Sequence, residues 1–124
     1  MKNKNISLLN VSIVFYETYS KFEKYKSKVR IFLDLIKFLN KDNFINQILV
    51  IDNSPIDRIK DNLQNLEKVK YVFTNKNIGF SKGHNLSKKY LEKVDFHLIL
   101  NPDIYIEDKK LFENIFNFLE INKD

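Results

Sequence analysis

The sequence contains no cysteine and no tryptophan, and only two glycines and two prolines among its 124 residues. Without cysteine the chain can form neither a disulfide framework nor a thiolate metal site. It also lacks an apolar run near the ~18 residues that a membrane-spanning helix needs. The first residues, MKNKNISLLNVSIVFYE, have the basic start and apolar stretch of a signal peptide. No small-residue cleavage site follows them, and the apolar residues alternate as in a strand, so we expect a cytoplasmic domain.

The composition is that of one globular domain, because 44% of the residues are hydrophobic and 30% are charged. The net charge of +5 favours anionic partners such as nucleotides, nucleic acid or a membrane surface. A solvated, lysine-rich surface is the favoured explanation of this charge. No nucleic-acid-binding motif accompanies the basic residues, so a nucleic-acid partner is not favoured.

Apolar residues alternate along the chain between strand-like runs and helical periodicity. The runs at residues 11–16, 47–51, 69–74 and 96–100 predict strands. Helical spacing predicts helices over residues 22–39, 56–66, about 80–91 and 111–121, the second with Ser54 as its cap and Pro55 at its first position. Strands that alternate with helices predict a three-layer α/β/α sandwich with a mostly parallel sheet.

Ligands of such sheets bind beyond the carboxyl ends of the strands, near a switch in strand order. The sequence ILVID places Asp52 at one such end, where a carboxylate can accept hydrogen bonds from a nucleobase or ribose. The following Asn-Ser-Pro is also strong turn chemistry, so a purely structural turn remains open here.

Both glycines of the chain fall in the segment NIGFSKGHN, residues 77–85, at the expected start of a helix. Glycine allows positive φ and a close approach of a ligand to the backbone, and Lys82 could face a diphosphate. The segment matches neither GxGxxG nor GxxxxGK[ST], and a glycine-assisted turn is the alternative. His84 and His97 have no visible catalytic partner and are assigned no catalytic role.

The run HLIL leads directly into Asn101-Pro102-Asp103. Pro102 fixes its own φ and biases Asn101 toward an extended conformation, which sets the relation between the two flanking polar side chains. Asp103 could coordinate Mg²⁺ or Mn²⁺, which take carboxylate oxygens while they bridge a diphosphate. A turn that ends the strand is again the alternative.

In order and spacing, four pieces resemble the N-terminal half of family 2 glycosyltransferases of the GT-A fold, especially the bacterial rhamnosyltransferase-like branch. The pieces are VSIVFYE, QILVIDNSP, TNKNIGFSKGHNLS and HLILNPDI, and together they cover most of residues 11–106. The resemblance implies a Rossmann-like nucleotide-diphospho-sugar transferase half-domain over residues 1–124.

The resemblance also implies roles for particular residues in binding the nucleotide-sugar donor. The end of the first strand lines the nucleobase pocket, although Glu17 stands where the family usually has Asn or a small polar residue. The NPD sequence replaces the family's DxD-like motif, with Asp103 at the position of the metal-binding aspartate. The donor-binding set implied in this way is Tyr16, Glu17, Asp52, Asn77, Gly79, Phe80, Gly83, Asn85 and Asn101.

The activity implied is inverting transfer of a sugar from a UDP- or dTDP-sugar to an acceptor in cell-surface polysaccharide or lipopolysaccharide synthesis. The acceptor would be a saccharide or a lipid-linked molecule, which suggests a place at the inner face of the cell membrane. A divalent cation, Mg²⁺ or Mn²⁺, would offset the charge of the leaving diphosphate.

The family's general base lies well beyond the DxD-like motif, and none of Glu107, Asp108 and Glu113 is assigned that role. The chain therefore resembles a truncated, donor-binding part of such an enzyme, with little transfer activity alone. The alternative is a non-catalytic nucleotide-sugar-binding module or partner subunit. An exposed edge strand in such a half-domain predicts pairing into a homodimer or marginal solubility.

Overall fold

A computed structural model describes residues 8–19 and 23–123 of the chain. Its four described strands are β1 (Leu9–Phe15), β2 (Ile45–Asp52), β3 (Val69–Phe73) and β4 (Phe96–Leu100). They form one sheet in the order β3-β2-β1-β4, and every pair is parallel. The predicted strands and the parallel sheet are confirmed.

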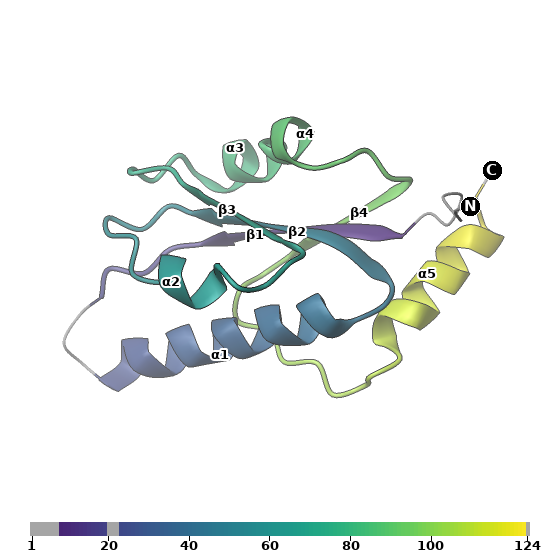
Figure 1. Ribbon diagram of the computed structural model, residues 1–124, viewed down its shortest axis with the longest axis horizontal. Helices are drawn as coiled ribbons and strands as arrows, with labels where there is room; N and C mark the ends of the chain where they lie inside the picture. Colours follow the sequence, from purple (N-terminus) through teal and green to yellow (C-terminus); the bar gives the residue numbers. More distant parts are fainter. Residues whose placement is uncertain (1–7, 20–22, 124) are drawn as a thin grey trace.

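Helices lie on both faces of this sheet, which confirms the three-layer α/β/α architecture (Figure 1). Helices α1 (Glu23–Lys41) and α2 (Lys60–Leu63) cover one face, and α3 (Phe80–Asn85) and α4 (Ser87–Tyr90) cover the other. The last helix, α5 (Leu111–Ile121), lies beside the end of α1. The predicted start of the first helix at residue 22 lies outside the described residues. No helix in the described part of the chain is both long and apolar enough to cross a bilayer.

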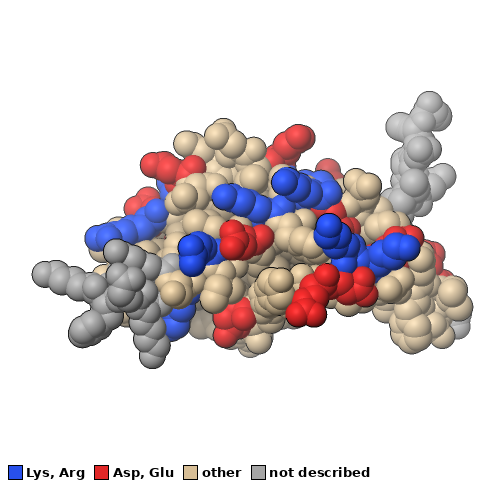
Figure 2. All heavy atoms as spheres, turned by 90° about the horizontal axis from the view of Figure 1, so that it is seen from below, with Lys and Arg blue, Asp and Glu red and all other residues tan. Residues whose placement is uncertain are grey.

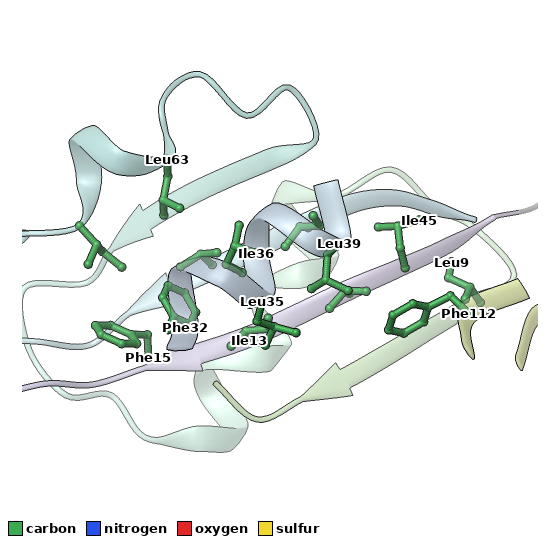
Figure 3. Packing of buried hydrophobic residues seen from close by; sticks show 14 residues of the cluster. Leu9, Ile13, Phe15, Phe32, Leu35, Ile36, Leu39, Ile45, Leu63 and Phe112 are labelled. Carbon is green, nitrogen blue, oxygen red and sulfur yellow. The ribbon is translucent and has the colours of Figure 1, made fainter. Parts of the chain in front are cut away.

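The main core lies between α1 and the sheet (Figure 3). Alternate residues of β1 point to this face, because side chains along a strand alternate between the two sides of a sheet. Helix α1 contributes a buried stripe at helical spacing. The fully or almost fully buried members are Leu9, Val11, Ile13, Phe15, Phe32, Leu35, Ile36 and Leu39. Burial of each such side chain contributes about 1.5–3 kcal/mol, so α1 and β1 hold each other in place.

Helix α5 is anchored to this core by aromatic side chains. Phe112 is 1% exposed, and its ring centroid lies 6.4 Å from that of Phe38 on α1. The ring of Phe116 lies 5.4 Å from Phe44 and 6.4 Å from Phe96. The chain after β4 is therefore tied back to the α1 face of the sheet.

Two helical predictions were wrong in detail. Helix α2 spans only Lys60–Leu63, so Pro55 is not its first residue and Ser54 is not its cap. Ser54 is fully buried and accepts a hydrogen bond from the backbone of Glu17 instead. The helix expected over residues 80–91 consists of α3 and α4, which meet at Leu86.

The strand order reverses direction between β1 and β4. The chain moves outward from β1 through β2 to β3 and then crosses back to add β4 on the far side of β1. In open α/β sheets, such a reversal leaves a crevice beyond the carboxyl ends of the two strands, where ligands bind. The fold thus places its expected ligand site at the ends of β1 and β4.

Candidate functional site

The residues that follow β1 and β4 meet at this reversal. Tyr16 and Glu17 come directly after β1, and Asn101, Pro102 and Asp103 come directly after its parallel neighbour β4. Tyr16 is 49% exposed, while Glu17 is only 7% exposed and lies 4.0 Å from Lys28 Nζ. Asn101 and Asp103 are exposed. The structure therefore brings these two sets of predicted residues to one edge of the sheet.

Asp52 is fully buried at the end of β2, and both of its carboxylate oxygens accept hydrogen bonds. The backbone N–H of Ser54 donates to Oδ1 at 3.0 Å, and the hydroxyl of Tyr71 donates to Oδ2 at 2.6 Å. Burial, followed by the hydrogen bond to Asp52, raises the pKa of Tyr71 well above its usual value, so this hydroxyl stays a donor. Asp52 thereby stabilises the turn after β2 that the sequence Asp-Asn-Ser-Pro predicted.

The turn after β2 is also joined to the end of β1. The N–H of Glu17 donates to Ser54 Oγ at 2.9 Å, and the N–H of Asn53 donates to the carbonyl of Phe15 at 2.8 Å. Next to this turn, burial together with the charge of Asp52 raises the pKa of Tyr19 to about 12. The first two predicted segments of the site thus form one hydrogen-bonded unit.

The buried side chain of Asn53 holds the third predicted segment, the loop after β3. Its Nδ2 donates to Asn77 Oδ1 and to the carbonyl of Gly79, both at 3.3 Å, and its Oδ1 accepts from Thr74 Oγ1 at 2.7 Å. Asn77 Oδ1 also accepts from the N–H of Gly79 at 3.0 Å. The loop that carries Asn77 and Gly79 is therefore fixed to the residue beside Asp52.

Glycine is required at positions 79 and 83 for different structural reasons. Gly79 has φ +91°, a backbone conformation that residues with a side chain rarely adopt, and no atom lies within 4 Å of where its Cβ would be. Gly83 faces the sheet, where a Cβ would lie 2.8 Å from Val14 Cγ2 and 3.5 Å from Ile51 Cγ2. Gly79 allows the turn into α3, and Gly83 allows α3 to approach the sheet closely. Phe80, between them, is 55% exposed.

Asn85 lies away from the loop of Asn77 and Gly79. It lines a cavity of about 450 Å³ between α3, α4 and β4. The cavity is also lined by His84, His97 and Ile99, but by neither Asp52 nor Asp103. The structure therefore does not bring Asn85 to the residues at the carboxyl edge.

Two histidines and a serine meet beside this cavity, although the sequence assigned them no role. Ser12 Oγ lies 2.6 Å from His84 Nδ1 and 2.8 Å from His97 Nε2. Ser12 is fully buried and His84 is 6% exposed. Burial lowers the pKa of both histidines below the usual range, and the charge of His97 lowers that of His84 further. We call these three side chains the histidine cluster.

Asp103 lines a second, larger cavity of about 780 Å³ between α1 and the segment that follows β4. Arg30 and Asp34 of α1 and Glu107 and Lys109 of that segment also line it. On this side of the molecule, basic and acidic side chains are intermingled and form no patch of one sign (Figure 2). The cavity thus offers Asp103 both space for a ligand and a mixed-charge rim.

The chain's own side chains supply few ligands for a metal ion. Within residues 8–19 and 23–123, no three His, Asp or Glu side chains are arranged to hold one together. The exposed carboxylate of Asp103 is a hard oxygen ligand of the kind that Mg²⁺ and Mn²⁺ prefer. These ions commonly use one or two carboxylates together with substrate phosphates, so the donor set fits an ion that arrives with a diphosphate.

Sequence reasoning missed the polar residues that hold the candidate site together. The missed residues are Ser12, Asn53, Ser54, Tyr71 and Thr74. Ser12 carried a signal, because it is a polar residue within an otherwise apolar predicted strand and must find a buried partner. Its partners, 72 and 85 residues away, leave no local pattern.

Comparison with known proteins identifies the fold. No protein-family model and no curated protein sequence matches the chain. Among solved structures, TarS 1-349 of S. aureus, a GT-A-type glycosyltransferase, aligns with 92% of this chain at 20% identity and a TM-score of 0.66. A second structure of S. aureus TarS aligns with 92% of the chain at 20% identity and a TM-score of 0.63. The chain spans 32% and 20% of those two chains. The likeness confirms a Rossmann-like α/β fold of the type found in a glycosyltransferase.

Proposed function

We propose that this chain is the nucleotide-sugar-binding part of a glycosyltransferase that acts in cell-wall or other surface polysaccharide synthesis. The observation that carries the proposal is the placement of Tyr16, Glu17, Asn101 and Asp103 at the ends of β1 and β4, where the strand order reverses. The similarity to the fold of TarS supports the same reading. The proposed domain is residues 1–124.

In this proposal the nucleobase lies near the ends of β1 and β2. Half-exposed Tyr16 offers an aromatic surface there, and Asp52 offers a carboxylate. A carboxylate has about four lone-pair sites, so two bonds to Ser54 and Tyr71 leave it able to accept one more. Uracil and thymine carry an N3–H donor that cytosine lacks, which favours UDP- or dTDP-sugars. Because Asp52 is fully buried, base binding would require a small movement of the residues that cover it.

The diphosphate and the sugar would lie toward β4 in the proposed site. Asp103 would hold a Mg²⁺ or Mn²⁺ ion, with Asn101 near the ribose or sugar. The ion would supply positive charge to the leaving diphosphate. Glu17, Asn77, Gly79 and Phe80 would complete the wall of the donor site, and the hydrogen bonds of Asn53 would keep that wall in place.

Inverting transfer also requires a base that deprotonates the acceptor hydroxyl. No residue of this chain is assigned that role, so we expect the chain alone to bind a donor and to transfer its sugar slowly or not at all. A nucleotide-sugar-binding module without transfer activity is the alternative function. The two proposals agree on the donor site and differ in whether an acceptor half completes it.

Calorimetric titration with UDP or dTDP in the presence of Mn²⁺ tests the donor site. We expect saturable binding by the wild-type chain that falls when EDTA removes the ion. Asp103→Ala should weaken binding at least about tenfold, because a lost charged contact costs more than ~1.4 kcal/mol. Asp61→Ala, which changes an exposed aspartate on α2, is the matched control. Equal affinities for the two variants would contradict the proposed site.

A further inference from the structure

The histidine cluster lies on the face of the sheet that α3 covers, and it joins three elements. Ser12 belongs to β1, His84 to α3 and His97 to β4. Both contacts to Ser12 Oγ are short, at 2.6 and 2.8 Å. The cluster therefore fixes α3 to the two strands whose ends carry the proposed donor site.

The number of protons in the cluster is limited by its geometry. A serine hydroxyl has one proton to donate and two lone pairs that can accept. With both imidazoles neutral, one ring nitrogen donates to Ser12 Oγ and the other accepts from it. One added proton on His97 preserves this arrangement, because its Nε2 then donates while Ser12 still donates to His84. A second proton makes both nitrogens donors, leaves the serine proton without an acceptor and places two cations against one oxygen.

The groups around the cluster also oppose a second positive charge. The cavity that His84 and His97 line is bordered by Lys88 of α4 and by Glu92 and Lys93 of the segment before β4. The two lysines outweigh the glutamate. His84 Nε2 is buried and has no hydrogen-bond partner among the described residues, so no acceptor in that part of the chain stabilises the positive charge of a protonated ring. The cavity gives solvent protons a route to His97 while the surroundings favour the neutral form.

The cluster is mechanically connected to both sides of the proposed donor site. The ring of His84 packs edge-on against Phe80, with ring centroids 4.3 Å apart, and Phe80 is the first residue of α3 after Gly79. Gly79 in turn is bonded to Asn77 and Asn53. His97 lies in β4, whose end leads into Asn101 and Asp103. A change in the contact between His84 and Ser12 would therefore alter the conformation of the loop that holds Asn77 and Gly79.

We propose that Ser12, His84 and His97 are positioning residues of the donor site, which hold α3 and its preceding loop in place until both imidazoles are protonated. This inference rests on the proposed function, because it concerns the same site. None of the three touches the donor; they act through Phe80, Gly79 and Asn77. Donor affinity should then depend on the charge of a cluster at some distance from the ligand.

The direction of the pH effect follows from the burial of the two rings. Their pKa values are lowered in the folded protein, so the folded state resists protonation that the unfolded or loosened state accepts. The positioning effect is complete at pH 7.5 and is lost as the pH falls below the ordinary histidine value of about 6.5. Below the apparent pKa of the cluster, UDP–Mn²⁺ affinity should fall by up to about tenfold per pH unit.

The test compares the pH dependence of UDP–Mn²⁺ binding in the wild-type chain with that in the variant H84N/H97Q. Asparagine places an amide near the position of Nδ1 and glutamine places one near that of Nε2, so both can bond to Ser12 without titrating. Each protein is compared with itself at pH 7.5 and pH 5.0, so a constant loss of affinity does not affect the result. The wild type should lose at least about tenfold more affinity than the variant over this range.

A second measurement follows the cluster without any nucleotide. Proton NMR of the histidine rings and amide exchange of residues 80–85 should change together as the wild-type chain is acidified. The single variant H97Q changes only the exposed member and serves if the double variant does not fold. Rings that titrate near pH 6.5 with no change in amide exchange would overturn the inference.

The outcomes separate this inference from the proposed function. If UDP–Mn²⁺ binds and the wild type and H84N/H97Q lose affinity in parallel, the histidine cluster has no positioning role and the donor site stands. If UDP–Mn²⁺ binds neither protein at pH 7.5, the proposed function is wrong and the inference fails with it. A pH dependence confined to the wild type supports both.

Discussion

At the scale of single residues, a buried carboxylate organises the candidate site. Asp52 accepts one hydrogen bond on each oxygen, from Ser54 and from Tyr71, and it lies at the end of a fully buried strand segment. A buried charge without partners would be costly, so these two donors are needed wherever the aspartate is ionised. The same bonds also hold the turn between β2 and α2 in the shape that meets β1.

Tyr71→Phe removes the hydroxyl that donates to Asp52 Oδ2. A hydrogen bond to a charged group contributes about 1.5–3 kcal/mol, so we expect the free energy of unfolding to fall by about this amount. Urea denaturation measures the change. Tyr105→Phe is the control, because Tyr105 is 82% exposed. An equal, small effect of both substitutions would show that the bond between Tyr71 and Asp52 does not stabilise the fold.

At the scale of secondary-structure elements, the position of α3 depends on how closely it approaches the sheet. Gly83 faces Val14 and Ile51, and an added Cβ would lie too close to Val14 Cγ2, at 2.8 Å, while Ile51 would stay at an ordinary contact distance. Because α3 also carries Phe80 and His84, its distance from the sheet sets the place of the loop that holds Asn77 and Gly79.

Gly83→Ala places a Cβ 2.8 Å from the stiff, β-branched Val14. Overpacking costs typically about 1–3 kcal/mol, while alanine in a helix gains up to about 1 kcal/mol over glycine, so we expect net destabilisation. Ser81→Ala changes an exposed position of the same helix and should be neutral or slightly stabilising. The midpoints of thermal unfolding compare the two variants. A Gly83→Ala protein as stable as Ser81→Ala would contradict the close packing.

The elements also show what the sequence can and cannot predict. The four strands and α5 were predicted to within two residues at each end, because buried parallel strands and amphipathic helices leave strong local patterns. Helix α2 was predicted too long, because Ser54 and Pro55 suggest a helix start, whereas Ser54 accepts a hydrogen bond from Glu17 in the segment that follows β1. Residues at the carboxyl edge were found from their positions after strands. The partners that orient them, Tyr71 and Asn53, depend on contacts between distant segments and could not be found locally.

At the scale of the whole molecule, β4 is an edge strand of the described sheet. Its five residues, FHLIL, contain no lysine, acidic residue or proline that would discourage pairing. Ile99 is 55% exposed on the face where the smaller cavity opens. This edge is therefore the place where we expect two copies of the chain to associate, through pairing of β4 with β4.

Ile99→Lys tests this self-association by placing like charges near each other across the proposed pair. We expect the wild-type chain to dimerise as its concentration rises and the variant to remain monomeric over a wider range. Light scattering coupled to size exclusion measures the mass. Ile56→Lys adds the same charge at a residue that is 45% exposed beyond the end of β2. A wild-type chain that stays monomeric, or two variants that dimerise equally, would contradict the prediction.

The architecture as a whole leads to one claim, that a nucleotide diphosphate and its metal ion bind where the strand order reverses between β1 and β4. Paramagnetic broadening by Mn²⁺ bound with UDP locates that ion directly in the ¹H–¹⁵N spectrum of the labelled chain. The strongest broadening should fall on the amide signals of Asn101, Asp103, Tyr16 and Glu17, and it should disappear in Asp103→Ala. Residues 93–95, at the opposite end of β4, should keep their signals. Broadening centred on that opposite end, or unchanged by Asp103→Ala, would contradict the account.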